Sequence, residues 1–188
     1  MKSKREQIFQ VSTQLFRHKG YASTSMQDIA NELNMKAASL YNHIASKQEI
    51  LSSLLLEGAQ LFIDRMEEVQ RSQLSLTEKI EQLIVVHVRL SVDRTDLMAL
   101  MAVEWRHLEG EALSQYKLDR EQYEAAFRGL ISEAIAKEEL QPVDVELALF
   151  SILTTLQRLY AWYDRHSHLN PFDLEKYLIQ CLLGGLRR

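Results

Sequence analysis

The chain has 188 residues, of which 46% are apolar and 26% are charged, and its net charge is −4. This length exceeds one typical domain, and the apolar content is enough for a sizeable core. A single cysteine, Cys181, excludes a disulfide framework or a cysteine-based metal cluster within one chain; we interpret it as a small core residue. The first residues contain no apolar leader, and no window reaches the roughly 18 to 20 continuous apolar residues of a membrane span. We therefore expect a cytoplasmic protein without membrane contact.

The chain contains only six glycines and two prolines, and both prolines, Pro142 and Pro171, lie late. Because nothing interrupts a helical pattern before residue 140, we predict an all-α chain of about nine helices. The first helix is expected over residues 2–19, and Gly20 is its expected C-terminal stop.

Residues 25–47 predict two short helices joined by a tight turn. Ser25, followed three residues later by Asp28, resembles a capping box at the start of the first of these helices. Asn34 tolerates the left-handed conformation that ends it. The apolar residues recur at the spacing of one helical face: Met26, Ile29, Ala30 and Leu33. Ser46 and Glu49 form an S-x-x-E box for a third, longer helix.

Two short helices with a tight turn indicate a helix-turn-helix, in which the second helix enters the major groove of DNA. Small side chains in that helix would let its backbone lie close to base edges, and Tyr41, Asn42 and His43 can donate to phosphates or bases. Lys47 stands at a helix N-terminus, which also favours a phosphate. An ordinary three-helix core is the alternative. The predicted DNA-contacting residues are Ser25, Met26, Lys36, Ala37, Ala38, Ser39, Tyr41, Asn42, His43 and Lys47.

The charge is distributed unevenly along the chain. Residues 1–50 carry seven basic and four acidic side chains, a balance of +3, whereas the remainder has a balance of −7. A basic head on an acidic body suits phosphate contact at one end only, and Lys2, Lys4 and Arg5 are free to approach a DNA backbone. We therefore assign residues 1–50 to a DNA-binding head and residues 51–188 to a helical body. No flexible linker separates them, because one helix is expected over residues 46–71.

The head resembles the N-terminal DNA-binding signature of the TetR (tetracycline-repressor-like) family of transcriptional regulators. The resemblance is carried, with its spacing kept, by Gly20-Tyr21, Thr24-Ser25-Met26, Asp28-Ile29-Ala30, Leu40-Tyr41-Asn42-His43 and Ser46-Lys47-Gln48-Glu49-Ile50-Leu51. Members usually carry Ser or Thr at the place of Lys36, a basic residue at Ala37 and Phe at Ile44. Lys36 would supply the cation one position early. The resemblance implies a repressor that binds a palindromic operator as a homodimer and is released by a small molecule.

The body is expected to hold helices that start at Ser75, Asp96, Glu111, Val143 and Pro171. The second includes Trp105, the fourth runs to about residue 165 and the last continues through residue 186. Ser75 and Glu78 form a further capping box. The helix from Val143 is apolar nearly all round, so it must be buried on several sides. We expect the last two helices to pair with the same helices of a second subunit, which is also the twofold four-helix arrangement that the resemblance implies.

The resemblance also implies a ligand pocket in the body. Apolar and aromatic residues with a few polar groups are the candidates for lining it, although aromatic residues and methionines at helical spacing belong to the core more often than to a pocket. They are Phe62, Met66, His87, Met98, Met101, Trp105, Arg106, Tyr123, Phe127 and Trp162. The run Glu104-Trp105-Arg106-His107-Leu108, with Arg120, Tyr123, Phe127-Arg128, Trp162-Tyr163 and Leu183-Gly184-Gly185-Leu186-Arg187, is similar to TetR-family regulators that sense acyl-CoA thioesters.

Under that second resemblance Arg106, Arg120 and Arg128 would bind phosphate or carboxylate groups, unless they are solvated or paired on the surface. A sensor of drugs or other hydrophobic compounds is the alternative for the ligand. A helical interaction module without DNA binding is the alternative from another class. We expect no enzyme, because no catalytic or nucleotide-binding motif occurs, and no cofactor other than an effector. His166 and His168 lack a third ligand for a metal.

Overall fold

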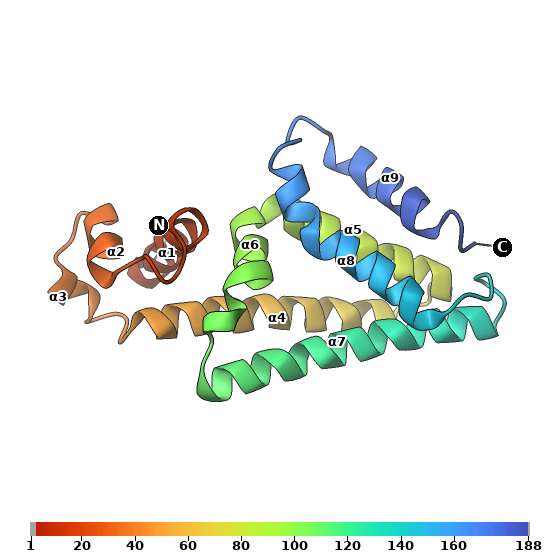
Figure 1. Ribbon diagram of the computed structural model, residues 1–188, viewed down its shortest axis with the longest axis horizontal. Helices are drawn as coiled ribbons and strands as arrows, with labels where there is room; N and C mark the ends of the chain where they lie inside the picture. The colour runs from red at the N-terminus through yellow and green to blue at the C-terminus, as the bar shows by residue number, and fades with distance from the viewer. Residues whose placement is uncertain (1–2, 188) are drawn as a thin grey trace. The chain divides into compact units, whose positions relative to one another are not determined.

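The structure is a computed structural model that describes residues 3–187. Within this range nine α-helices and one short 3-10 helix account for the regular structure, so the predicted all-α class is confirmed (Figure 1). None of the described helices is both long and apolar enough to cross a bilayer. In chain order the elements are α1 (Lys4–Lys19), α2 (Met26–Glu32), α3 (Ala37–Leu40), α4 (Lys47–Arg71), α5 (Leu76–Asp93), α6 (Thr95–Val103), η1 (Glu104–His107), α7 (Gly110–Ala136), α8 (Val145–Tyr163) and α9 (Pro171–Leu183).

Side-chain caps set the starts of several helices. Ser25 before α2 and Ser75 before α5 each form the predicted reciprocal box with an acidic residue three positions on. The side-chain oxygen of Asn170 accepts from Phe172 N at 2.9 Å, with proline at the start of α9 as predicted. A further box, at Ser3 and Glu6, starts α1 at Lys4, two residues after the predicted start. Lys2 lies outside the described residues.

Two predicted helix ends were wrong. The helix that was expected from Asp96 through Trp105 stops at Val103, and Trp105 belongs to η1. The last helix ends at Leu183, not at residue 186, because two glycines follow it and the chain then turns back. There the amide of Gln141 donates to the carbonyl oxygen of Leu186 at 2.6 Å, which ties the C-terminal end to the segment after α7.

The chain divides into two compact units. Unit 1 comprises Met1–Ala59 together with Asp96–Lys117, and unit 2 comprises Gln60–Thr95 together with Leu118–Arg188. The predicted division at residue 50 falls inside α4, which is one uninterrupted helix of 25 residues with a part in each unit. Unit 1 therefore contains α6 and η1 as well as the predicted head.

The core of unit 1 joins α1, α2 and α3. Ile8 and Phe16 of α1 are fully buried, as are Ile29 of α2 and Leu40 of α3. Helix α2 packs against both α1 and α3. Because α3 has only four residues, it depends on this packing to hold its conformation.

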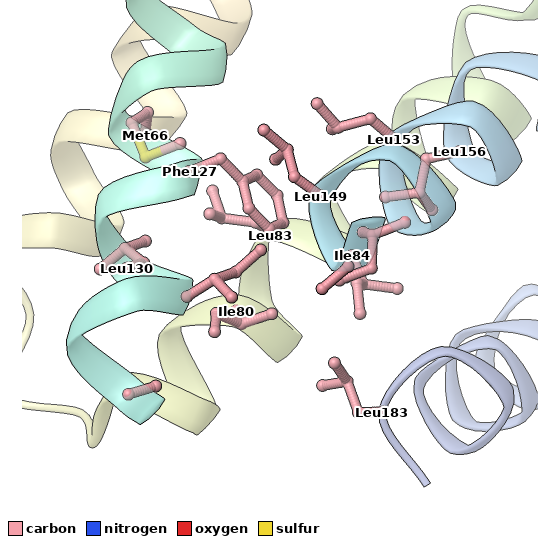
Figure 2. Packing of buried hydrophobic residues seen from close by; sticks show 14 of the residues in the cluster. Met66, Ile80, Leu83, Ile84, Phe127, Leu130, Leu149, Leu153, Leu156 and Leu183 are labelled. Carbon is pink, nitrogen blue, oxygen red and sulfur yellow. The ribbon is translucent and has the colours of Figure 1, made fainter. Parts of the chain in front are cut away.

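The core of unit 2 is formed by side chains from five helices (Figure 2). Helix α5 packs against both α8 and α9. In Figure 2 the ring of Phe127 projects from α7 toward the side chains of α5 and α8. The labelled members are Met66, Ile80, Leu83, Ile84, Phe127, Leu130, Leu149, Leu153, Leu156 and Leu183.

Helices α8 and α9 each keep one face uncovered in the single chain. The expectation that the helix from Val143 is buried on several sides was wrong for one chain, because Leu147 and Phe150 of α8 are exposed. Phe172 and Tyr177 of α9 are exposed as well. Cys181 also lies on the uncovered side of α9, so its interpretation as a core residue was wrong.

Replacing Ser75 by alanine should remove the cap of α5 and lower the free energy of unfolding by about 1 kcal/mol. In the structure Ser75 Oγ accepts from Glu78 N at 3.3 Å and donates to Glu78 Oε2 at 2.8 Å. Urea unfolding followed by circular dichroism measures the change. Ser114→Ala, in the exposed interior of α7, is the control and should have little effect. Equal stability of the two variants would contradict the cap's role.

Candidate nucleic-acid interface

The turn between α2 and α3 is closed by backbone hydrogen bonds. Asn34 has a φ of 51°, which is the left-handed conformation expected for it. The amide of Met35 then donates to the carbonyl oxygen of Ala30 at 2.9 Å. After this turn α3 begins at Ala37, and Leu40 and Ile44 are buried behind it. The local sequence thus directs one side of α3 into unit 1 and leaves the other side free.

Five residues on the free side of α3 and beside it are exposed, and we call them the recognition surface: Lys36, Ala38, Tyr41, Asn42 and His43. Residues 33–46 contain no acidic side chain. Ala37 and Ser39, the other predicted contacts on this helix, are half-buried. A surface with one cation, several hydrogen-bond donors and small residues can approach a polyanion closely without repulsion.

Lys47 has a structural role that the sequence did not indicate. Its ammonium group donates to the carbonyl oxygens of Tyr21 and Thr24, each at 2.7 Å, and lies 4.2 Å from the centroid of the Tyr21 ring. Partial burial lowers the pKa of this ammonium group. Two of its three donors therefore hold α4 to the loop between α1 and α2, and one donor is left for a phosphate. Its predicted contact with DNA stays a prediction.

Ser25 and Met26 lie at the start of α2. The hydroxyl of Ser25 accepts from Asp28 N at 3.1 Å and donates to Asp28 Oδ2 at 2.6 Å, while Met26 is half-buried. Lys19 pairs with the same carboxylate at 2.9 Å. These hydrogen bonds, from Ser25 first and from Lys19 next, hold the pKa of Asp28 well below its usual range. The visible role of Ser25 is thus to cap α2.

Arg5 was expected to be free for a DNA backbone, and the structure gives it internal partners instead. Its guanidinium donates to the carbonyl oxygen of His43 at 3.3 Å and to Glu49 Oε1 at 3.1 Å. The second oxygen of Glu49 accepts from Ala45 N at 2.7 Å. Arg5 also lies over the ring of Phe9, 5.0 Å from its centroid. Arg5 thus connects α1 and α4 to the C-terminal end of the recognition surface.

Helix α6 and η1 are attached to the same unit. Gln48 donates to the carbonyl oxygen of His107 at 3.0 Å and accepts from the hydroxyl of Tyr21 at 2.6 Å. The ion pair between Arg17 and Asp96 joins α1 to α6. Met101 packs directly on α4, since a Cβ placed on Gly58 would lie 2.6 Å from its sulfur.

The predicted pocket residues fall into three groups. Met98, Met101, Trp105 and Arg106 belong to unit 1, where Trp105 stacks on Tyr116 at 6.4 Å and Arg106 is exposed. Trp162 of unit 2 is 39% exposed and stacks on His166 at 4.2 Å. The other five, all in unit 2, lie in or against its core: Phe62, Met66, His87, Tyr123 and Phe127.

We call Phe62, His87, Tyr123 and Phe127 the aromatic cluster. Nε2 of His87 is 3.0 Å from the hydroxyl oxygen of Tyr123, and the ring of Phe62 contacts both, with centroid distances of 4.6 Å and 5.5 Å. Phe127 adjoins Tyr123 at 6.2 Å. The predicted role of these residues in binding a ligand stays a prediction.

Two of the three candidate arginines are paired. Arg128 Nε donates to Glu146 Oε1 at 2.5 Å and its Nη2 to Glu146 Oε2 at 3.2 Å, and Arg120 pairs with Glu124 at 3.4 Å. Among the described residues no cluster of three or more metal-ligating side chains occurs. In the structure Arg120 and Arg128 therefore form ion pairs within the chain, which was the alternative to binding a phosphate or carboxylate of a ligand.

Replacing Lys47 by methionine should lower the free energy of unfolding by about 2 kcal/mol, because two carbonyl groups lose a charged donor while the aliphatic stem is kept. Lys36→Met is the matched control. Lys36 is exposed and its side chain does not cap α3, so this variant should stay within about 0.5 kcal/mol of the parent. Urea unfolding followed by circular dichroism compares them, and equal loss in both would contradict the structural role of Lys47.

Two family descriptions match most of the chain. The family description "Bacterial regulatory proteins, tetR family" matches residues 8–54, and "Tetracyclin repressor-like, C-terminal domain" matches residues 73–186. The fatty acid metabolism regulator protein of Bacillus subtilis (strain 168) is 25% identical over 191 aligned residues, which cover 99% of this chain and 98% of the relative.

Solved structures agree in fold. The ketosteroid transcriptional regulator KstR2 of Mycobacterium tuberculosis matches with a TM-score of 0.94 and 20% identity, covering 100% of this chain and 97% of its own. AibR, crystallised in complex with isovaleryl coenzyme A and operator DNA, matches with a TM-score of 0.84 and 23% identity, covering 96% and 98%. Because the C-terminal family description alone spans more than half of the sequence, the chain belongs to the TetR family of bacterial regulatory proteins.

Proposed function

We propose that this chain is a homodimeric repressor that places α3 in the major groove of a palindromic operator and is released by a small apolar effector. The observation that carries the proposal is the recognition surface, an exposed and acid-free helix face held rigidly by buried Leu40 and Ile44. Lys36 and Tyr41 would fix phosphates, and small Ala38 would lie near base edges. The family is regulatory, and the proposal assigns the chain no catalytic activity and a cytoplasmic location, where operator DNA lies.

The uncovered faces of α8 and α9 support the homodimer. Leu147 and Phe150 are 64% and 65% exposed, and Phe172 and Tyr177 are 72% and 58% exposed. Large apolar side chains that are exposed on two consecutive helices mark an interaction surface more often than a free one. A twofold axis through these helices would bury them against their own copies and present two α3 helices to two half-sites.

An acyl-CoA thioester is our first choice for the effector, and a drug or other hydrophobic compound is the second. The similarity to the fatty acid metabolism regulator of Bacillus subtilis, and to AibR in complex with isovaleryl coenzyme A, favours the acyl-CoA thioester. Binding in unit 2 would shift α4, whose first turn holds the loop before α2 through Lys47. The two α3 helices of the dimer could then no longer meet both half-sites.

The double variant Lys36→Ala/Tyr41→Ala should lose about tenfold or more in operator affinity, because each half-site loses phosphate contacts. Tyr41 is 54% exposed, so folding should be unaffected. The operator is first selected from random duplex DNA with the parent protein, and fluorescence anisotropy then gives the Kd. Lys117→Ala, an exposed lysine on α7, is the control for loss of charge. Parental affinity in the double variant would place the contact surface elsewhere.

The dependence of parental affinity on salt separates DNA binding from a helical interaction module. A binder that makes several phosphate contacts per dimer should lose about a thousandfold between about 50 mM and about 200 mM salt. The same anisotropy measurement provides this slope. Affinity that is flat with salt, or no selected operator, would favour the interaction module.

Leu147→Glu should convert the dimer to a monomer, since a charge would then be buried on each side of the twofold interface. Glutamate near the N-terminus of α8 favours the helix itself, so the fold of the chain should be kept. Analytical ultracentrifugation measures the mass. Leu74→Glu, at a residue 39% exposed between α4 and α5, is the matched control and should remain dimeric. A Leu147→Glu dimer would exclude this interface.

A further inference from the structure

Unit 2 buries one polar pair among its aromatic side chains. His87 of α5 and Tyr123 of α7 are only 6% and 7% exposed, and their mutual hydrogen bond is 3.0 Å long. Neither side chain has a second hydrogen-bond partner among the residues that the structure describes. A leucine and a phenylalanine would fill this part of the core without the cost of burying polar atoms.

The pair retains one unused donor whichever way the shared proton lies. If Nε2–H of His87 donates to the phenol oxygen, the hydroxyl hydrogen of Tyr123 is free. If the hydroxyl donates instead, Nδ1–H of His87 is free. Burial lowers the pKa of His87 to about 3 and raises the pKa of Tyr123, so both groups are neutral at physiological pH. The pair therefore offers a neutral donor, and neither of its members is a cation.

Phe62 covers this pair. Its ring stacks at a tilt on His87 and meets Tyr123 edge-on, and unlike them it is only half-buried. Phe62 belongs to α4, the helix that begins at Lys47. A group that reaches the donor from the side of Phe62 would displace this ring, and this contact would connect the pair to α4.

We propose that Tyr123 donates its hydroxyl hydrogen to an uncharged carbonyl oxygen of the effector, with His87 Nε2–H holding the phenol in place and Phe62 moving aside. This inference rests on the proposed effector-responsive function and specifies the effector's chemistry. The surrounding apolar side chains suit a hydrocarbon chain or ring next to the carbonyl. A thioester or a ketone fits. A carboxylate does not, because neither member of the pair is a cation that would compensate its burial.

The test compares matched ligands on the purified full-length protein. Saturated acyl-CoA thioesters of increasing chain length, a long-chain ketone and a free fatty acid are screened by thermal shift. The best carbonyl compound is then compared, by isothermal titration calorimetry, with its analogue that has a methylene in place of the carbonyl. For a thioester this analogue is the S-alkyl-CoA thioether.

The parent should bind the carbonyl compound about tenfold more tightly than its methylene analogue, as one buried hydrogen bond allows. Tyr123→Phe removes a single oxygen atom and should bind both compounds equally. Tyr160→Phe, a buried phenol of α8 in the same unit, is the matched control and should keep the parental preference. His87→Leu should weaken the preference and His87→Gln, which keeps an N–H donor, should restore part of it.

Equal binding of the two compounds by the parent, a preference that survives in Tyr123→Phe, or tightest binding of the carboxylate would each overturn this inference. Absence of binding by every carbonyl compound would overturn it too. Operator affinity, measured on the same preparation, tests the regulator separately: a protein that binds its operator but fails these comparisons keeps its DNA-binding function and loses only this assignment.

Discussion

The hydrogen bonds from Lys47 to the carbonyl oxygens of Tyr21 and Thr24 are the constraint on which the DNA-binding part depends. They fix the first turn of α4 to the loop that leads into α2. Helix α3 is a single turn and cannot be stable alone, so its orientation follows from α2 and from buried Leu40 and Ile44. A displacement of α4 therefore changes the support of the recognition surface, without any change within α3 itself.

Local sequence patterns predicted local structure well. The boxes at Ser25 and Ser75 were confirmed, because a cap needs only residues three positions apart. The box at Ser46 is half formed: Ser46 Oγ accepts from Glu49 N at 3.0 Å, but the carboxylate of Glu49 turns to Ala45 and Arg5. Glu49, the carboxylate partner of Arg5, is 44 residues away, and sequence spacing cannot identify one acidic side chain among the many at such distances.

Helical periodicity could not distinguish a pocket residue from a core residue. Met101 and Phe127 were both candidates for the pocket, yet Met101 packs on Gly58 in unit 1 and Phe127 lies in the core of unit 2. Nor could it tell which molecule covers an apolar face. The apolar residues of α8 divide between this chain's own core and an uncovered face, and only coordinates separate Leu149, which is buried, from Leu147, which is not.

An effector releases a repressor from DNA only if it binds the released conformation more tightly than the DNA-binding conformation. Equally tight binding to both conformations does not shift the equilibrium between them. A hydrocarbon chain gains about 0.8 kcal/mol for each buried methylene wherever an apolar cavity forms, which supplies affinity with little selectivity. A buried donor discriminates, because it is satisfied in one state and unsatisfied in the other. The His87–Tyr123 pair, covered by Phe62 of α4, places a selective donor beside apolar side chains that supply affinity. The carbonyl group and the Phe62 ring could then not occupy the same place beside the pair. Effector binding would therefore be coupled to α4, the helix that supports α3.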